Sequence, residues 1–283
     1  MRITRRALLG TLPLLAQNRN YPPDLPGFEK ELFRKIGDVE LNVWITGRGQ
    51  GPPRPAAAFF FGGGWTNGSP IQFQKHAELL ASNGLTVFLV DYRVKSRHNV
   101  SVPACVADAK AAIRWVRANA KRLNINPNRI AAGGGSAGGH LAAATAVLPG
   151  FEDGEHLTVS SKPNALLLFN PALMLVPEGG SDTGLDKSVS ERFGGDPRAV
   201  SPIHHVTKSA PPTIIFHGKA DTTVPYRTVE AYQKKAAGLG AKCILEGYEG
   251  QTHGFFNFGR GDYYARTTER MLVFLRELGY VKS

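Results

Sequence analysis

The sequence predicts one α/β domain with a mostly parallel central sheet and helices on both faces. Apolar strand-like runs alternate with helical patterns from residue 31 almost to the C-terminus, as in sheets whose parallel strands are joined by helices. Most of these runs are apolar throughout, which is typical of strands buried on both faces. The length of 283 residues, with 42% hydrophobic and 20% charged residues, suits a single large globular domain. Two cysteines are too few for a disulfide scaffold or a four-cysteine zinc site.

Residues 1–17 have the pattern of an export signal. Arg2, Arg5 and Arg6 give a basic start, and the apolar stretch that follows is too short to span a membrane. The adjacent arginines fit a twin-arginine signal, which exports folded proteins. We therefore expect a periplasmic or extracellular protein with its domain at residues 18–283 and no insertion into the membrane. Removing the three arginines lowers the net charge from +11 to +8, and no basic arm or stripe indicates nucleic-acid binding.

The predicted sheet begins with a hairpin. Residues 31–36 and 39–45 are strand-like runs joined at Gly37-Asp38, and they predict an antiparallel edge of the sheet. Residues 56–61 form a continuous apolar run, which predicts the first buried strand. That run stops at three glycines, residues 62–64.

The middle of the chain alternates between helix and strand. Residues 73–82 have a helical pattern closed by an Asn-Gly pair, and residues 85–90 predict a second buried strand. Apolar residues recur with helical spacing over residues 102–123, which predicts a long helix. Residues 130–132 form a short strand that runs into glycines, and a helix follows at residues 137–148.

The last part of the sequence predicts three strands and two helices around one long irregular segment. The strands are residues 165–169, 213–216 and 243–248, and the helices are residues 225–239 and 263–278. Residues 174–212 break the alternation with several Pro and Gly residues. Long loops inside a compact domain are usually functional covers or insertions, so we expect a short cap over the site.

Residues 134–138 carry the first chemical signal, Gly-Gly-Ser-Ala-Gly. A Gly-x-Ser-x-Gly pattern between a strand and a helix predicts a sharp turn that lifts the hydroxyl of Ser136 above the sheet as a nucleophile. The same stretch also satisfies the dinucleotide-binding pattern Gly-x-Gly-x-x-Gly. That pattern normally opens the first strand–helix unit and needs an acidic residue at the end of the next strand. Here it lies in mid-chain, and the acidic residues that follow lie in a polar loop.

A serine nucleophile needs a base, and the base needs an acid that orients it. Asp221 follows the predicted strand 213–216, and His253 follows the predicted strand 243–248. Both therefore lie at the carboxyl ends of strands, as Ser136 does, and these ends meet at one edge of a parallel sheet. The order serine, acid, histidine predicts that Ser136 attacks a carbonyl, His253 moves the proton and Asp221 fixes the imidazole tautomer.

The three glycines after residue 61 predict an oxyanion hole. Their backbone N–H groups can be directed at the negative oxygen that develops in acyl transfer. We assign this role to the N–H groups of Gly63, Gly64 and Ala137. A bare turn is the alternative interpretation.

With these motifs the sequence resembles the α/β-hydrolase superfamily, and within it the acetyl esterase/lipase branch that includes bacterial feruloyl and acetyl esterases. The resemblance covers nearly the whole chain after the signal and implies an α/β-hydrolase fold. It rests on six motifs: Phe-Gly-Gly-Gly-Trp at 61–65, Asp-Tyr-Arg at 91–93, Ala-Asp-Ala at 107–109, the glycine-rich residues 133–140, His-Gly-Lys-Ala-Asp at 217–221 and Gly-Gln-Thr-His-Gly-Phe at 250–255. The resemblance implies no metal and no organic cofactor, and the sequence has no metal-ligand spacing. Phe61 departs from the family pattern, in which this loop begins with a histidine whose side chain braces the loop. Phenylalanine forms no side-chain hydrogen bonds, so Phe61 cannot brace the loop in this way.

Four residues are candidate substrate contacts. Trp65 and Phe255 flank predicted catalytic elements and are candidates for an aromatic wall, with core packing as the alternative. Arg97 follows the carboxyl end of a strand, where a guanidinium can bind uronate or sulfate groups, and a solvated loop is the alternative. His205 in the irregular segment is a candidate pocket residue or a loop-packing side chain.

These observations predict a serine carboxylic-ester hydrolase that works through an acyl-enzyme. We expect short-chain or aromatic acyl esters as substrates, with acetyl or feruloyl groups on plant polysaccharide as the leading candidates. A serine peptidase or a lipase on the same fold is one alternative. A non-catalytic binding protein is another, although such proteins usually lose a member of the serine, acid and histidine set, and none is lost here.

Overall fold

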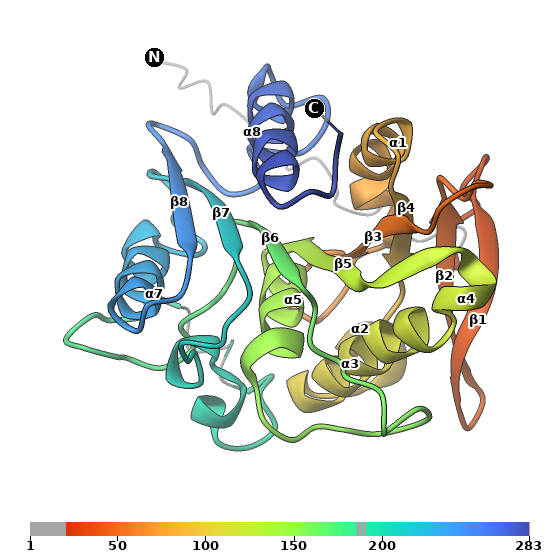
Figure 1. Ribbon diagram of the computed structural model, residues 1–283. Helices are drawn as coiled ribbons and strands as arrows, with labels where there is room; N and C mark the ends of the chain where they lie inside the picture. The colour runs from red at the N-terminus through yellow and green to blue at the C-terminus, as the bar shows by residue number, and fades with distance from the viewer. Residues whose placement is uncertain (1–20, 186–188, 190, 283) are drawn as a thin grey trace, which may run out of the picture.

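The computed structural model describes residues 21–185, 189 and 191–282, and the predicted export signal at 1–17 lies outside them. The described residues form one eight-stranded sheet with the strand order β1-β2-β4-β3-β5-β6-β7-β8 (Figure 1). The strands are β1 Glu29–Ile36, β2 Val39–Thr46, β3 Arg54–Phe60, β4 Thr86–Val90, β5 Ile125–Gly135, β6 Ala165–Phe169, β7 Thr213–Gly218 and β8 Cys243–Tyr248. Strands β1 and β2 form the predicted antiparallel hairpin, β2 also pairs with β4 in antiparallel fashion, and all other pairings are parallel. The predicted fold class is confirmed.

Strands β3 and β5 lie at the point where the strand order changes direction. β4 lies on one side of β3 and β5 on the other, and Phe60 at the end of β3 is level with Gly134 in β5. In open α/β sheets the crevice for ligands forms at such a point, outside the carboxyl ends of the strands. The loops that follow β3 and β5 are therefore neighbours.

Helices cover both faces of the sheet (Figure 1). Their bounds are α1 Gln74–Ser82, α2 Lys95–His98, α3 Val102–Ala118, α4 Ala120–Leu123, α5 Ala137–Val147, α7 Tyr226–Gly238 and α8 Tyr263–Glu277. Buried residues of α1 and α8 share one hydrophobic cluster, and those of α3, α5 and α7 share another. Strand β3 contributes side chains to both clusters. Phe59 packs in the cluster with α1 and α8, and Phe60 packs in the cluster with α3, α5 and α7.

Three elements differ from the sequence-based prediction. The helix predicted over residues 102–123 is interrupted at Asn119, between α3 and α4. Strand β5 begins at Ile125, five residues before the predicted strand; Ile125 pairs with Arg54, and a register shift separates this pair from the regular pairing that starts at Ile130. Helix α2 was not predicted; its four residues end at His98, and the next residue, Asn99, lies in the left-handed region with φ of 49°.

The irregular segment 174–212 lies between β6 and β7, and its described residues include the short 3-10 helices η2 Pro197–Val200 and η3 Pro202–His204. Its described residues pack against the nucleophile helix α5, where the imidazole Nε2 of His140 lies 2.7 Å from the carbonyl of Val200. Whether this segment acts as a cap stays a prediction. Among the helices of the described chain, none is long and apolar enough to cross a membrane.

Candidate active site

Ser136 lies at a sharp turn between β5 and α5. Its φ of 53° and ψ of −119° are rare for any residue with a side chain, so surrounding contacts must hold this conformation. Its N–H donates to the carbonyl of Phe169 at 2.9 Å, and its carbonyl accepts from the N–H of His140 at 2.9 Å. A side chain on Gly138 would overlap the carbonyl oxygen of Phe60, so only glycine lets the helix approach strand β3 this closely.

The structure brings Asp221 and His253 together, with Asp221 Oδ2 2.7 Å from His253 Nδ1. The other carboxylate oxygen accepts from the N–H groups of Thr223 and Val224, both at 2.9 Å. His217 Nε2 also lies 3.3 Å from Asp221 Oδ2. Burial alone would raise the pKa of Asp221, but the hydrogen bonds from His217 and His253 hold that pKa well below its usual value. The carboxylate is therefore ionised and its orientation is fixed.

Asn170 is a site residue that the sequence analysis missed. It follows strand β6 directly, and its side-chain Nδ2 lies 3.4 Å from His253 Nε2. In the described part of the chain, the hydroxyl of Ser136 makes no hydrogen bond to this nitrogen. The available signal was a polar residue at the carboxyl end of an apolar strand, the same signal that identified Asp221 and His253.

Residues 61–68, called the glycine loop here, lie beside Ser136. A side chain on Gly62 would come within 3.4 Å of the Cβ of Ser136. The N–H of Gly62 donates to Gln72 Oε1 at 2.7 Å. None of the hydrogen bonds among the described residues uses the N–H of Gly63 or Gly64. As the first residue of α5, Ala137 has no acceptor one turn earlier in the helix.

Other contacts hold the glycine loop where Phe61 cannot. The ring of Phe61 stacks on Tyr92 with the ring centroids 4.1 Å apart. Arg97 Nη1 donates to the carbonyl of Gly68 at 2.9 Å, and Arg192 Nη1 donates to the carbonyl of Gly64 at 3.0 Å. The loop is thus braced through its backbone carbonyls by two arginines from other segments.

The two aromatic candidates for substrate contacts pack inside the protein. Trp65 is 4% exposed, and its indole N–H donates to His140 Nδ1 at 3.2 Å. Phe255 is also 4% exposed, and its ring centroid lies 4.9 Å from that of Tyr248. These positions favour the core-packing interpretation, and a substrate contact stays a prediction for each.

The two basic candidates also have partners in the protein. The guanidinium of Arg97 lies 3.7 Å from the ring centroid of Tyr21, in addition to its contact with Gly68. His205 Nε2 lies 2.9 Å from the carbonyl of Arg198. Both side chains therefore have structural roles, and charge recognition by Arg97 stays a prediction.

The described residues contain no group of three or more His, Cys, Asp or Glu side chains arranged to hold a metal ion. Cys105 and Cys243 are free thiols. Burial raises the pKa of Cys105 above its usual value and that of Cys243 to about 12, so neither is a ready nucleophile.

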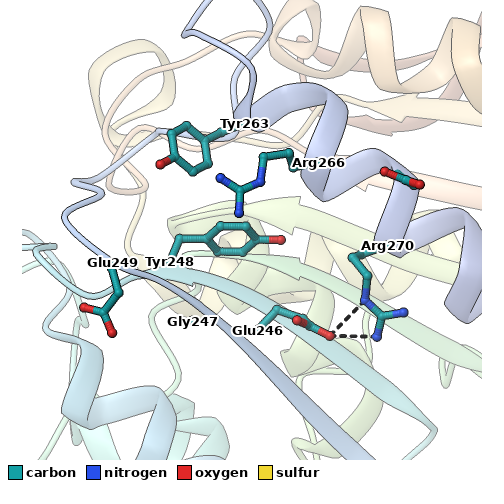
Figure 2. Close-up of a pocket in the computed structure, with 8 residues that line it drawn as sticks. Glu246, Gly247, Tyr248, Glu249, Tyr263, Arg266 and Arg270 are labelled. Carbon is teal, nitrogen blue, oxygen red and sulfur yellow. Dashed lines mark hydrogen bonds and ion pairs between the residues drawn. The ribbon is translucent and has the colours of Figure 1, made fainter.

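One surface hollow of about 440 Å³ lies between the edge strand β8 and helix α8 (Figure 2). The Arg266 guanidinium points between the rings of Tyr248 and Tyr263, and Arg270 donates to Glu246 Oε1 at 2.7 Å. None of the predicted site residues lines this hollow. It is a separate feature at the sheet edge.

Comparisons with known proteins agree with the α/β fold described above. The BD-FAE family model matches residues 41–169 and 180–236. A structure of esterase 2 from Thermogutta terrifontis, phosphonylated by sarin, is 45% identical, covers 93% of this chain and 99% of its own, and has a TM-score of 0.88. A propionate-bound structure of that esterase is 47% identical over the same shares, with a TM-score of 0.87. Esterase LipC of Mycobacterium tuberculosis is 31% identical over 76% of this chain and 56% of its own. The chain thus spans about half the length of this curated relative.

Proposed function

The chain belongs to the BD-FAE family of α/β-hydrolase esterases, and on that premise we propose that it is a serine carboxylic-ester hydrolase. The observation that carries the proposal is the 2.7 Å contact between Asp221 and His253 at the same sheet edge as the strained turn at Ser136. An imidazole oriented by a buried carboxylate, at the same sheet edge as a half-buried serine turn, is the arrangement that activates a hydroxyl.

The reaction proceeds in two steps. Nε2 of His253 takes the proton of the Ser136 hydroxyl as its oxygen attacks the ester carbonyl. The N–H groups of Gly63, Gly64 and Ala137 stabilise the negative oxygen of the tetrahedral intermediate. The imidazolium then protonates the leaving alcohol, which leaves an acyl group on Ser136. Water activated by the same imidazole releases the acid.

We propose short-chain acyl esters as the preferred substrates, with acetyl esters among them. The propionate-bound relative supports a small acyl group, because that ligand is a short carboxylate. Feruloyl esters and esters carried by plant polysaccharide extend the proposal to aromatic acyl groups and bulky alcohols. Export through residues 1–17 is a further proposal, and cell fractionation of the full chain beside a variant with both Arg5 and Arg6 replaced by lysine tests it.

Initial rates test the esterase proposal. We compare 4-nitrophenyl acetate, butyrate and decanoate with methyl ferulate, for the wild type and Ser136→Ala. We expect the highest rate on the short esters and a loss of about 10⁵–10⁶-fold in kcat in the variant, since the three residues act as a unit. A highest rate on decanoate points to the lipase alternative, and hydrolysis of peptides but not esters points to the peptidase. Full activity in Ser136→Ala would mean that another residue is the nucleophile.

A further inference from the structure

Three carboxamide side chains connect the glycine loop to the histidine loop, residues 249–257. Gly62 N–H donates to Gln72 Oε1 at 2.7 Å, and Gln72 Nε2 donates to Asn257 Oδ1 at 3.1 Å. Asn257 Nδ2 donates to the carbonyl of Gly254 at 2.8 Å, and Gly254 N–H donates to Asn170 Oδ1 at 3.1 Å. Gln72 lies in the 3-10 helix η1 Pro70–Phe73, Asn257 in the histidine loop and Asn170 directly after β6, and we call the three side chains the carboxamide ladder.

A backbone group determines which way Asn170 faces. A backbone N–H can only donate, so Oδ1 of Asn170 must face Gly254 and Nδ2 must face His253. A donor opposite Nε2 favours the imidazole that keeps a lone pair there and its proton on Nδ1. Asp221 Oδ2 accepts that proton at 2.7 Å. This is the tautomer that a general base in a serine hydrolase requires.

The backbone of Asn170 is as constrained as its side chain. The residue is 1% exposed, and its N–H donates to the carbonyl of Phe216 in β7 at 2.8 Å. Its φ of 33° lies in the left-handed region, which asparagine tolerates better than most residues with side chains. The preceding residue, Phe169, accepts the N–H of Ser136. Asn170 and the preceding Phe169 therefore connect the turn at Ser136, strand β7, which leads to Asp221, and the histidine loop.

We propose that the carboxamide ladder is a positioning device, in which Asn170 selects the base tautomer of His253 and Gln72 sets the position of the glycine loop over Ser136. The inference rests on the proposed function. Gly62 lies so close to Ser136 that a small displacement of this glycine changes the distance between the loop and the serine. The Phe61 ring cannot supply a hydrogen bond to the loop, so the Gln72 amide supplies the one at Gly62.

The long contact at Nε2 fits this role. At 3.4 Å the hydrogen bond from Asn170 is weak, and the hydroxyl of Ser136 replaces it when a substrate aligns the site. Asn170 thus orients the ring at rest without competing strongly for the lone pair that catalysis uses.

Asn170→Asp tests the histidine end of the ladder. The variant keeps the size of the side chain, its tolerance of positive φ and the oxygen that accepts from Gly254, but it places a carboxylate opposite Nε2. Two titratable groups already lie near the His253 imidazole. Asp221 Oδ2 contacts its Nδ1, and His217 contacts the same Asp221 oxygen. The added charge favours the imidazolium, so the acid limb of kcat/KM against pH moves to higher pH by about one unit or more. A side chain at position 170 that does not face Nε2 would change the rate without moving this limb, so an unmoved limb contradicts the assigned contact.

NMR of ¹⁵N-labelled histidine gives a readout that does not depend on activity. The His253 ring is assigned by comparison with His253→Gln, and its nitrogen shifts report the tautomer directly. We expect the Nδ1–H tautomer in the wild type and a titration midpoint at higher pH in Asn170→Asp. An Nε2–H tautomer in the wild type, or identical midpoints in both proteins, overturns the role of Asn170 even if the protein is not an esterase.

Gln72→Met and Gln72→Glu test the other end. Met removes both hydrogen bonds of the ladder at this position, whereas Glu keeps the acceptor for Gly62. We expect Met to lower kcat about tenfold, the cost of one positioning hydrogen bond, with KM nearly unchanged, and Glu to recover most of the loss. Gln74→Met is the matched control, because Gln74 donates to Glu78 within α1 and makes no hydrogen bond to the described residues of the two loops. Equal kcat in Gln72→Met and Gln74→Met rejects the role of Gln72. A wild type that hydrolyses no ester refutes the proposed function and with it the role of Gln72, while the NMR result still decides the role of Asn170.

Discussion

The two sides of the site are held in different ways. On the acid–histidine side, both oxygens of the buried Asp221 carboxylate have fixed partners, and His253 is held at both ring nitrogens. On the glycine-loop side, the N–H groups of Gly63 and Gly64 have no partner in the described chain, and arginines and Gln72 hold the loop from outside. A proton carrier must be oriented before the reaction, whereas groups that stabilise a developing charge must stay free until it forms. The difference follows from the two tasks.

Asp221→Asn breaks the first side and has the largest expected effect. The amide still fits the pocket, but its nitrogen donates where a carboxylate oxygen should accept, so the imidazole is held in the wrong tautomer. We expect kcat to fall about 10³–10⁴-fold with the fold intact, which steady-state kinetics and a thermal unfolding curve check. A loss below tenfold would assign the acid to another residue.

Gly63→Ala breaks the second side. At a φ of 124° an added Cβ would overlap the carbonyl of Asn67, so the loop must shift. Its N–H groups then no longer point at the position of the developing negative oxygen. We expect kcat to fall about 10²–10³-fold, the range seen when one oxyanion donor is lost. Gly51→Ala, at a φ of 95° in open space, is the control for backbone strain alone. If both variants lose activity equally, strain and not the loop explains the loss.

Two buried histidines, one near each side of the site, allow the two sides to be compared by their effect on the free energy of unfolding. His140, beside the glycine loop, has hydrogen-bond partners at both nitrogens. His76 has none among residues 21–185, 189 and 191–282, and it packs against Phe73 and Tyr264. Burial lowers the pKa of His76 to about 3 and that of His140 to about 4. Below the usual value of 6.5 the unfolded histidines take up protons and the folded ones do not. As the pH is lowered from 6.5 toward 4, the free energy of unfolding therefore decreases by about 1.4 kcal/mol per pH unit for each histidine.

Urea unfolding of His76→Leu and His140→Leu at neutral and acid pH checks this account. His76→Leu replaces an unpaired imidazole with an apolar group, so we expect a gain of about 1 kcal/mol at neutral pH and a weaker pH dependence. His140→Leu leaves the indole N–H of Trp65 and the carbonyl of Val200 unpaired, so we expect a loss of about 1–3 kcal/mol. The opposite order would mean that the contacts of His140 do not stabilise the fold.

Arg97→Met has the smallest expected effect. It removes the hydrogen bond to Gly68 but keeps an apolar stem against Tyr21, so the glycine loop loses one of several braces. We expect a loss of less than about tenfold in kcat/KM, equal on neutral and uronate-type esters. A loss confined to the anionic ester would restore the charge-recognition role that the sequence indicated.

The sequence predicted the parts of the site that depend on local patterns. Ser136 could be found because its turn needs small residues in a fixed pattern, and Asp221 and His253 because each is a chemically suitable residue just after an apolar strand. Every predicted strand and helix is present, with differences mainly at boundaries. Strand β5 was predicted too short because residues 126–128, Asn-Pro-Asn, have no strand-like pattern, and only the pairing of Ile125 with Arg54 shows that the strand begins before them.

The carboxamide ladder could not be predicted in this way. Gln72 and Asn257 are 185 residues apart in the chain, and neither belongs to a motif with a fixed spacing. Amide side chains occur in many loops, and only the folded arrangement shows which ones meet. Asn170 shares the end-of-strand position with the predicted residues, but asparagine is not an acid, a base or a nucleophile, so its position alone gave no chemical signal.

The irregular segment between β6 and β7 has a consequence for engineering. Its described contacts with the site run through few groups: Arg192 with the carbonyl of Gly64, Phe193 with Trp65, and the carbonyl of Val200 with His140. The assigned triad and oxyanion residues all lie in other segments of the chain. Because this segment supplies none of the reacting groups, its sequence can change without altering the scaffold that holds them. A graft that replaces residues 176–185 and keeps 192–201 would therefore leave both the core residues Met174 and Leu175 and the reacting groups in place.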